Sequence, residues 1–198
     1  MDALRAHLPE IAVAAALAWG SGLRLYAVLF LVGLAGWLGW IELPIHLRLL
    51  AHPLVLGASG FMTLVEFFAD KVPWLDSVWD AVHSFIRIPA GAALAAAVFA
   101  DSGTAVALAA LVLGGGIAAG THLAKTGGRA VINTSPEPVT NWFMSLTEDG
   151  FVPAGLWLAI THPMAFLALL GAFAIAAVLL LRQIALGLGL LLARLRGR

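Results

Sequence analysis

The stretch EFFADKVPWLDSVWDAVHSFIRIP, residues Glu66–Pro89, is rich in polar groups and lies between two long apolar runs. Its acidic, basic and imidazole side chains are Glu66, Asp70, Lys71, Asp76, Asp80, His83 and Arg87. A second polar island, residues 122–150, follows in the other half of the chain. Charged side chains within apolar sequence usually have a partner or a function. We therefore expect the functional residues in these two islands.

The composition is typical of a polytopic membrane protein. Of the 198 residues, 62% are hydrophobic and 11% are charged, with a mean hydropathy of +0.98. In soluble domains about a quarter of the residues are charged. The net charge of zero provides no basic field for nucleic acid. The chain has no cysteine, which excludes disulfides, thiol catalysis and thiolate zinc sites. We expect an all-α helical bundle, with residues 1–198 forming a single transmembrane domain.

Apolar runs predict five to six spans, some of them broken by glycine or proline. The first run, Ile11–Leu43, suits either one tilted helix or a broken pair meeting at Gly20–Arg24, because one span needs roughly 20 residues. Further spans are expected at His52–Phe68, Thr104–Lys125 and Met164–Leu181. Gly127-Gly128 is expected to end the helix that begins with the run Thr104–Lys125. Two apolar segments, Ile88–Ala100 and Phe151–Ile160, are too short to span comfortably on their own.

The segment Trp74–Arg87 has the pattern of an amphipathic helix. One face carries only apolar side chains, and the other carries Asp76, Asp80, His83 and Arg87. The pattern predicts a helix that lies in the membrane interface or dips into the bilayer as a re-entrant element. Its polar stripe is either a solvated face or a proton or cation site, with a metal site as one form of the latter.

Glu66 follows a run without charge that begins at Pro53, which predicts a position within or at the edge of the hydrocarbon. Lys71 and Arg24 are the two partners that we expect for it. Either a structural ion pair between helices or a proton- or ion-coupled role would explain such a residue.

In the second island, His122, Lys125 and Arg129 have helical spacing. Together with Arg24 they would form a cationic pocket for a phosphate or carboxylate group, or else pair with acidic residues from elsewhere, including Glu148 and Asp149. Three local features complete the island. Asn133 begins a loop that caps the backbone, Ser135-Pro136-Glu137 starts a short helix to about Leu146, and Ser145–Glu148 fits a capping box.

The two halves of the chain, residues 8–100 and 104–182, are candidate half-repeats. Each contains a Gly-interrupted apolar segment, an Arg after Gly and an acidic residue before Pro. Weak internal symmetry with broken hydrophobic segments is a feature of transporters built from inverted repeats.

Several short motifs carry a resemblance to a known family: Gly22-Leu23-Arg24, Glu66–Pro73, Asp76–Asp80, Arg87–Gly91, Arg129–Pro136 and Ser145–Asp149. In these motifs the sequence resembles the 4126 family of domains of unknown function, which are small bacterial polytopic membrane proteins. The resemblance implies a helical membrane fold and polar islands that are the family's signature. With it we expect a location in the bacterial inner (plasma) membrane. It supplies no substrate.

Three functions are compatible with the sequence. The first is a transporter or channel-like protein for a small ion or polar solute, with an intramembrane charged site. The second is a non-transporting membrane scaffold or accessory subunit whose charges form structural ion pairs, and the third is a membrane-embedded enzyme that modifies lipid. No catalytic motif is present, so we expect no enzyme, no cofactor and no nucleic-acid partner. The expected partners are the lipid bilayer, a small ion or solute and a second copy of the chain. The candidate binding residues are Arg24, Glu66, Asp70, Lys71, Asp76, Asp80, His83, Arg87, His122, Lys125, Arg129, Asn133, Glu148 and Asp149.

Overall fold

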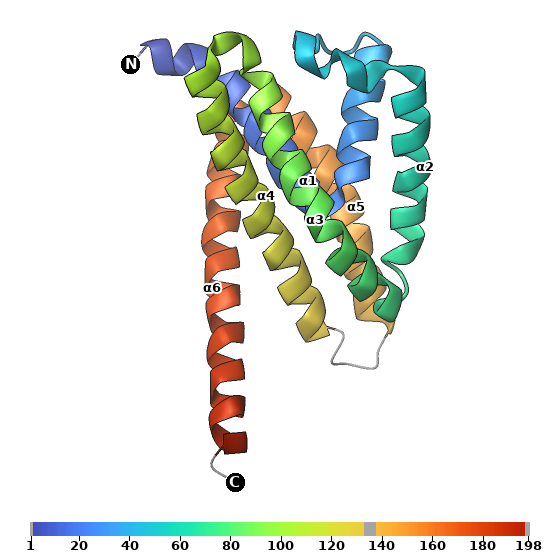
Figure 1. Cartoon of the computed structure of the whole chain (residues 1–198), viewed down its shortest axis with the longest axis vertical. Coiled ribbons are helices and arrows are strands. Elements are labelled where there is room, and N and C mark those ends of the chain that lie inside the picture. Colours follow the sequence, from blue (N-terminus) through green and yellow to red (C-terminus); the bar gives the residue numbers. More distant parts are fainter. Residues whose placement is uncertain (1, 133–137, 197–198) are drawn as a thin grey trace.

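The computed structural model describes residues 2–132 and 138–196, which form six α-helices and two short 3-10 helices without any strand. The helices are α1 (Asp2–Trp37), η1 (Ile45–Ala51), α2 (Pro53–Ala69), α3 (Pro73–Val98), η2 (Ala100–Ser102), α4 (Thr104–Ile132), α5 (Pro138–Thr161) and α6 (Pro163–Arg196). Figure 1 shows a bundle in which α6 extends beyond the other helices. The predicted all-α helical bundle is confirmed.

Helix α1 is the central element of the bundle and contacts each of the other five α-helices. Its side chains between Ala12 and Val32 are mostly buried. The backbone leaves helical geometry at Arg24, where φ is −144° and ψ is 80°. The structure thus has a kink at the end of Gly20–Arg24, where a broken pair was one of the two predicted alternatives. The whole of His7–Trp37 nevertheless counts as one candidate span.

Helix α3 differs from the prediction in its length and in the direction of its polar face. It is one helix of 26 residues that continues through Pro89, so Trp74–Arg87 and the short apolar run after it are not separate elements. Its polar face is buried, whereas Phe85 on the apolar face is 84% exposed. The prediction of an interfacial or re-entrant helix is wrong, because α3 is long and apolar enough to span the membrane. Its exposed apolar face suits contact with lipid, and its polar face is turned into the bundle.

Two further predicted breaks are absent from the helices that the structure describes. Helix α4 continues through Gly127-Gly128 to Ile132, and α5 continues past Leu146 to Thr161. Inside an apolar environment the backbone must satisfy its hydrogen bonds within the helix, which outweighs the weak helix propensity of glycine. The capping box expected at Ser145 is wrong for the same reason, since this residue lies in the middle of a helix.

Four helices are long and apolar enough to cross a membrane: His7–Trp37, Trp74–Val98, Thr104–Ile132 and Pro163–Gly187. A fifth span is possible if η1 and α2, which are bent by 66°, are taken as one. These helices make the chain an integral membrane protein. Only with the bent pair does the count reach five, the lower of the two predicted numbers of spans, and no sixth candidate occurs in the described part of the chain.

Helices α1, α3 and α4 approach one another closely at small residues, which we call the small-residue crossing: Gly22, Gly91, Ala95, Gly114 and Ala118. A Cβ atom added to Gly22 would lie 2.5 Å from the carbonyl oxygen of Ala118. One added to Gly91 would lie 2.6 Å from the Cβ of Ala118. Small side chains at such contacts allow membrane helices to pack backbone against backbone. This contact fixes the positions from which α1, α3 and α4 present their charged residues.

Candidate functional site

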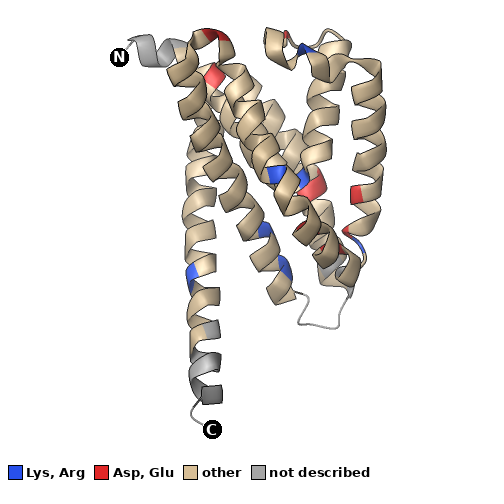
Figure 2. Cartoon of the chain, viewed as in Figure 1, with Lys and Arg blue, Asp and Glu red and all other residues tan. Residues whose placement is uncertain are grey.

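Most of the charged candidates gather in the part of the bundle where α2 ends and α3 and α5 begin. Figure 2 shows the basic residues in blue and the acidic residues in red. We call this group the charged cluster. It has six acidic members, Glu66, Asp70, Asp76, Asp80, Glu148 and Asp149, and five basic members, Arg24, Lys71, Arg87, Lys125 and Arg129. Nine are buried, and only Lys71 and Asp149 are partly exposed. The cluster therefore lies in the interior of a membrane protein.

Glu66 is paired with Arg87. One terminal nitrogen of the Arg87 guanidinium, Nη2, lies 2.5 Å from Oε1 of Glu66, and the other, Nη1, donates to Oδ1 of Asp80. All three side chains are almost completely buried. The expected partners of Glu66, Lys71 and Arg24, are wrong. The true partner is 21 positions further along the chain, on a different helix, which no local spacing indicates.

Lys125 brings together carboxylates from three parts of the chain. Its ammonium nitrogen lies 3.2 Å from Asp70 Oδ2, 3.3 Å from Asp80 Oδ1 and 3.4 Å from Glu148 Oε2. It also donates to the carbonyl oxygen of Leu23, at 3.2 Å, beside the kink of α1. An ammonium group has three hydrogens to donate and no acceptor. Lys125 thus links α4 to the end of α2, to α3 and to α5.

Arg24 reaches the cluster from the kink of α1. Its Nη2 lies 3.0 Å from both Asp70 Oδ2 and Asp149 Oδ1, and donates to Ser145 Oγ at 3.0 Å. Lys71 also contacts Asp149, at 3.7 Å, and burial lowers the pKa of Lys71 while Asp149 opposes that shift. Ser145 is a site residue that the sequence analysis missed. The signal that could have found it is its position three residues before Glu148, on the same helical face.

Arg129 pairs with Glu148 through two nitrogens, Nε and Nη2, each 3.3 Å from one carboxylate oxygen. Its Nη1 lies 3.6 Å from Oδ2 of Asp76. The cationic residues of α4 are therefore ion-paired with acidic residues from other elements. Of the two predicted alternatives, the structure has the pairing with acidic residues for Lys125 and Arg129, while binding of a phosphate or carboxylate group by these cations stays a prediction.

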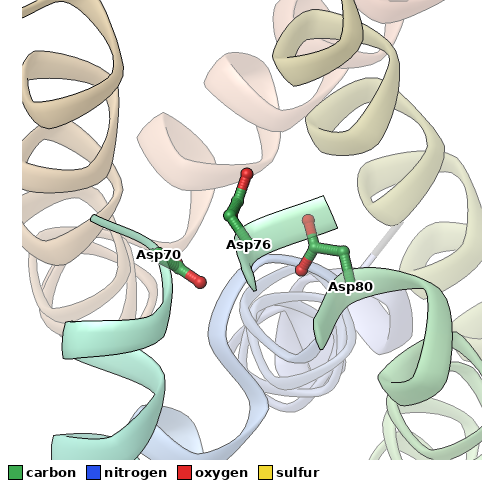
Figure 3. A group of neighbouring side chains, drawn as sticks. All are labelled: Asp70, Asp76 and Asp80. Atoms are coloured by element: carbon green, nitrogen blue, oxygen red, sulfur yellow. The ribbon is translucent and has the colours of Figure 1, made fainter. Parts of the chain in front are cut away.

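Asp76 has a different environment from the other acidic residues. It is completely buried, yet neither of its carboxylate oxygens accepts a hydrogen bond from any residue that the structure describes. Figure 3 shows it beside Asp70 and Asp80, and one oxygen of each of the three lies within 4.8 Å of the others. Three carboxylates so close together repel one another when all are ionised.

The two candidate histidines lie beside the cluster and have neutral partners. Nδ1 of His83 lies 2.8 Å from the carbonyl oxygen of Trp79, whose ring stacks on the imidazole. Nε2 of His122 lies 2.6 Å from Ser84 Oγ. Asn133, the remaining candidate, lies outside the described residues, as does the helix start expected at Ser135.

The fold and the cluster define the class: a small polytopic helical membrane protein with a buried, ion-paired centre. The chain belongs to the DUF4126 family, a domain of unknown function, whose family model matches residues 11–183. The matched range includes all members of the charged cluster, and the predicted family resemblance is confirmed. No curated protein and no solved structure matches the chain.

Proposed function

We propose that this protein transports a small cation across the membrane and that the charged cluster is its binding site, seen here in an occluded form. The supporting observation is an imbalance of charge. The described members of the cluster comprise six carboxylates but five cationic side chains. Asp76 is completely buried, and both of its carboxylate oxygens lack a hydrogen-bond partner among the described residues. One additional positive charge would complete the cluster.

The physical argument rests on the cost of burying charge. An ion without compensation inside a protein is destabilising by several kcal/mol, and the bilayer increases that penalty. A cation that enters the cluster therefore gains a favourable interaction that it lacks in the hydrocarbon. The kink at Arg24 and the turn between α2 and α3 at Asp70–Val72 place two interruptions of the helices next to the site. Such interruptions are where membrane transporters bind their ions.

A non-transporting scaffold or accessory subunit is the second candidate function. The observation in its favour is that each of the five cationic side chains pairs with a carboxylate from another element. Ion pairs of this kind would hold the five helices from α1 through α5 in one arrangement, without any ion crossing the membrane. The two candidates differ in whether the cluster exchanges a cation with its surroundings.

Three finer features of the account are proposals as well. We place the protein in the bacterial inner membrane because the family that it resembles consists of small bacterial membrane proteins. The half-repeats 8–100 and 104–182 would supply the two parts that move relative to each other. A second copy of the chain would complete the wall of the pathway.

Reconstituted vesicles provide the test. Purified protein in lipid vesicles is given an outward or inward gradient of protons, Na⁺ or K⁺, and ion movement is followed with fluorescent indicators. We expect movement of one ion with the natural protein and none with Asp76→Asn. Phe85→Leu, a change on the lipid-facing side of α3, should behave like the natural protein. If the folded natural protein moves no ion under any gradient, the transporter proposal fails and the scaffold is favoured.

A further inference from the structure

We infer that the additional positive charge of the charged cluster is a proton carried by the carboxyl group of Asp76. The inference deepens the proposed function, because it names the ion, and it rests on the same cluster. Its observations are the charge balance of the cluster, the contacts of each carboxylate, and the cationic groups already present around the three aspartates.

The charge balance is independent of the partly exposed members. Over all described members, the negative charges outnumber the positive charges by one. If the partly exposed pair of Lys71 and Asp149 is set aside, five buried carboxylates still face four buried cations. Among the described buried members, the cluster thus has one positive charge fewer than negative charges. A monovalent species neutralises it, whereas a divalent ion would leave an excess of positive charge.

The contacts of the carboxylates locate the proton. Each of the other five acidic side chains has an oxygen at most 3.3 Å from a cationic nitrogen. For Asp76 the nearest such contact among the described residues is 3.6 Å, to Arg129, and neither oxygen accepts a hydrogen bond from any of them. Asp76 therefore has the weakest stabilisation of its ionised form. A carboxyl group that is poorly compensated and buried becomes neutral by taking up a proton.

The surroundings of Asp76 favour a proton over a metal ion. The charged groups near it are Asp70 from the α2–α3 turn, Asp80 from its own helix, and Lys125 and Arg129 from α4, while Arg24 of α1 and Glu148 of α5 contact these groups. The ammonium group of Lys125 already bridges Asp70 and Asp80, at 3.2 Å and 3.3 Å. A metal ion between the three aspartates would lie against this ammonium and compete with it. A proton on Asp76 relieves the repulsion from the other two carboxylates, which Figure 3 shows beside it. Of the ion pairs in the cluster it removes only the 3.6 Å contact of Asp76 with Arg129, which keeps its pairing with Glu148.

Two buried histidines, His83 and His122, can also take up a proton, and His83 already donates from Nδ1 to the carbonyl oxygen of Trp79. Ser84 Oγ donates its one hydrogen to the carbonyl oxygen of Asp80, at 2.8 Å. His122 must then donate the hydrogen on Nε2 to Ser84 Oγ, at 2.6 Å. Neutral His122 satisfies this bond, so its geometry does not require an additional proton. A variant at His122 separates the two locations.

Infrared spectroscopy of the purified protein in lipid vesicles, without any ion gradient, tests the inference. A protonated carboxyl group has a carbonyl band that is distinct from the carboxylate bands and shifts in D2O. We expect one such band from the buried cluster at neutral pH, its loss in Asp76→Asn, and its retention in His122→Gln and Asp149→Asn. Asp76→Glu should keep a band at a shifted frequency, which preserves the test if Asp76→Asn does not fold.

Three results would overturn the inference. These are a natural protein without the band, a band that persists in Asp76→Asn, and thermal stability that requires Na⁺, K⁺ or Mg²⁺ at constant pH. The outcome is separable from that of the transport test. A band that behaves as expected, in a protein that moves no ion, would establish the proton site and refute transport. Movement of Na⁺ or K⁺ without the band would establish transport and refute the proton.

Discussion

The small-residue crossing and the charged cluster hold the same three helices, α1, α3 and α4, but by different interactions. At the crossing, Gly22 and Gly91 contact Ala118 so closely that no larger side chain fits. In the cluster, α3 and α4 are joined by charged side chains such as Lys125 and Asp80. Packing of small residues favours one separation of the helices and is independent of charge. Ion pairs depend on how many protons or ions the cluster holds. We therefore expect a change in the number of bound protons or ions to alter the contacts of the charged cluster. The packing of the helices at the small-residue crossing should stay the same.

Cavity size does not locate the function in this molecule. A cavity of about 800 Å³ lies between α1, α3 and α4 and is lined by apolar residues such as Ile11, Ala95 and Ile117. No member of the charged cluster lines it. The charged cluster has no need of a large cavity, because its side chains fill the space between the helices and contact one another.

The largest effect is expected from removing the cation at the centre of the cluster. Arg87→Met leaves Glu66 and Asp80 buried without their guanidinium partner. Breaking a buried ion pair in this way costs about 3–5 kcal/mol. We expect little folded protein in detergent, as measured by size-exclusion chromatography. Adding Glu66→Gln to Arg87→Met should recover part of it. Normal yields of folded Arg87→Met would show that the ion pairs contribute little to stability.

A smaller effect is expected at the small-residue crossing. Gly91→Leu places a large side chain against Ala118, and overpacking of this kind costs about 1–3 kcal/mol. Gly116→Leu is the matched control, because no atom lies within 4 Å of its added Cβ. Unfolding in mixed micelles should show a lower stability for Gly91→Leu than for the control. Equal stability of the two variants would mean that the helices do not pack as closely as described.

The smallest effect is expected at Asp76. Asp80→Asn removes an acceptor of Arg87 and a contact of Lys125, and loss of a hydrogen bond to a charged group costs about 1.5–3 kcal/mol. Asp76→Asn removes no hydrogen bond to a described residue, so we expect a change within about 1 kcal/mol. A proton on Asp76 in the folded state also means that stability falls as the pH rises above about 4, the ordinary pKa of an aspartate, because the unfolded chain loses this proton there and the folded protein retains it. Asp76→Asn should lack that part of the pH dependence in thermal unfolding. A larger loss for Asp76→Asn than for Asp80→Asn would contradict the assigned contacts.

The sequence allowed prediction of much of the fold and of the members of the cluster. Helical spacing of Asp76, Asp80 and Arg87 predicted one polar face on α3, and the structure has that face. Local spacing carries this information because residues four apart lie on one side of a helix. A break at Gly20–Arg24 was one of two predicted alternatives for the first apolar run, and the structure has a kink at Arg24.

Other features depend on contacts between distant parts of the chain. Glu66 and Arg87 lie on different helices, and Arg24 meets Ser145 across 121 positions, so no local pattern indicates either pair. The continuity of α3 through Pro89 and of α4 through Gly128 was missed because propensities measured in water understate helix formation in lipid. The direction of the polar face of α3 was missed for a related reason. An amphipathic helix faces water at a membrane surface but faces other helices inside a bundle.

Labelling of an introduced cysteine tests the central claim, that the charged cluster exchanges an ion with both sides of the membrane. The chain has no cysteine, so Ser145→Cys places a single thiol of similar size beside Arg24. Trp40→Cys, at a position that is 75% exposed between α1 and η1, is the one-sided control. A membrane-impermeant thiol reagent is applied to intact cells and to inverted vesicles. Our account predicts that Ser145→Cys is labelled from both sides and Trp40→Cys from one. Labelling of folded Ser145→Cys from one side only, or from neither, would contradict it and would identify the cluster as a fixed structural centre.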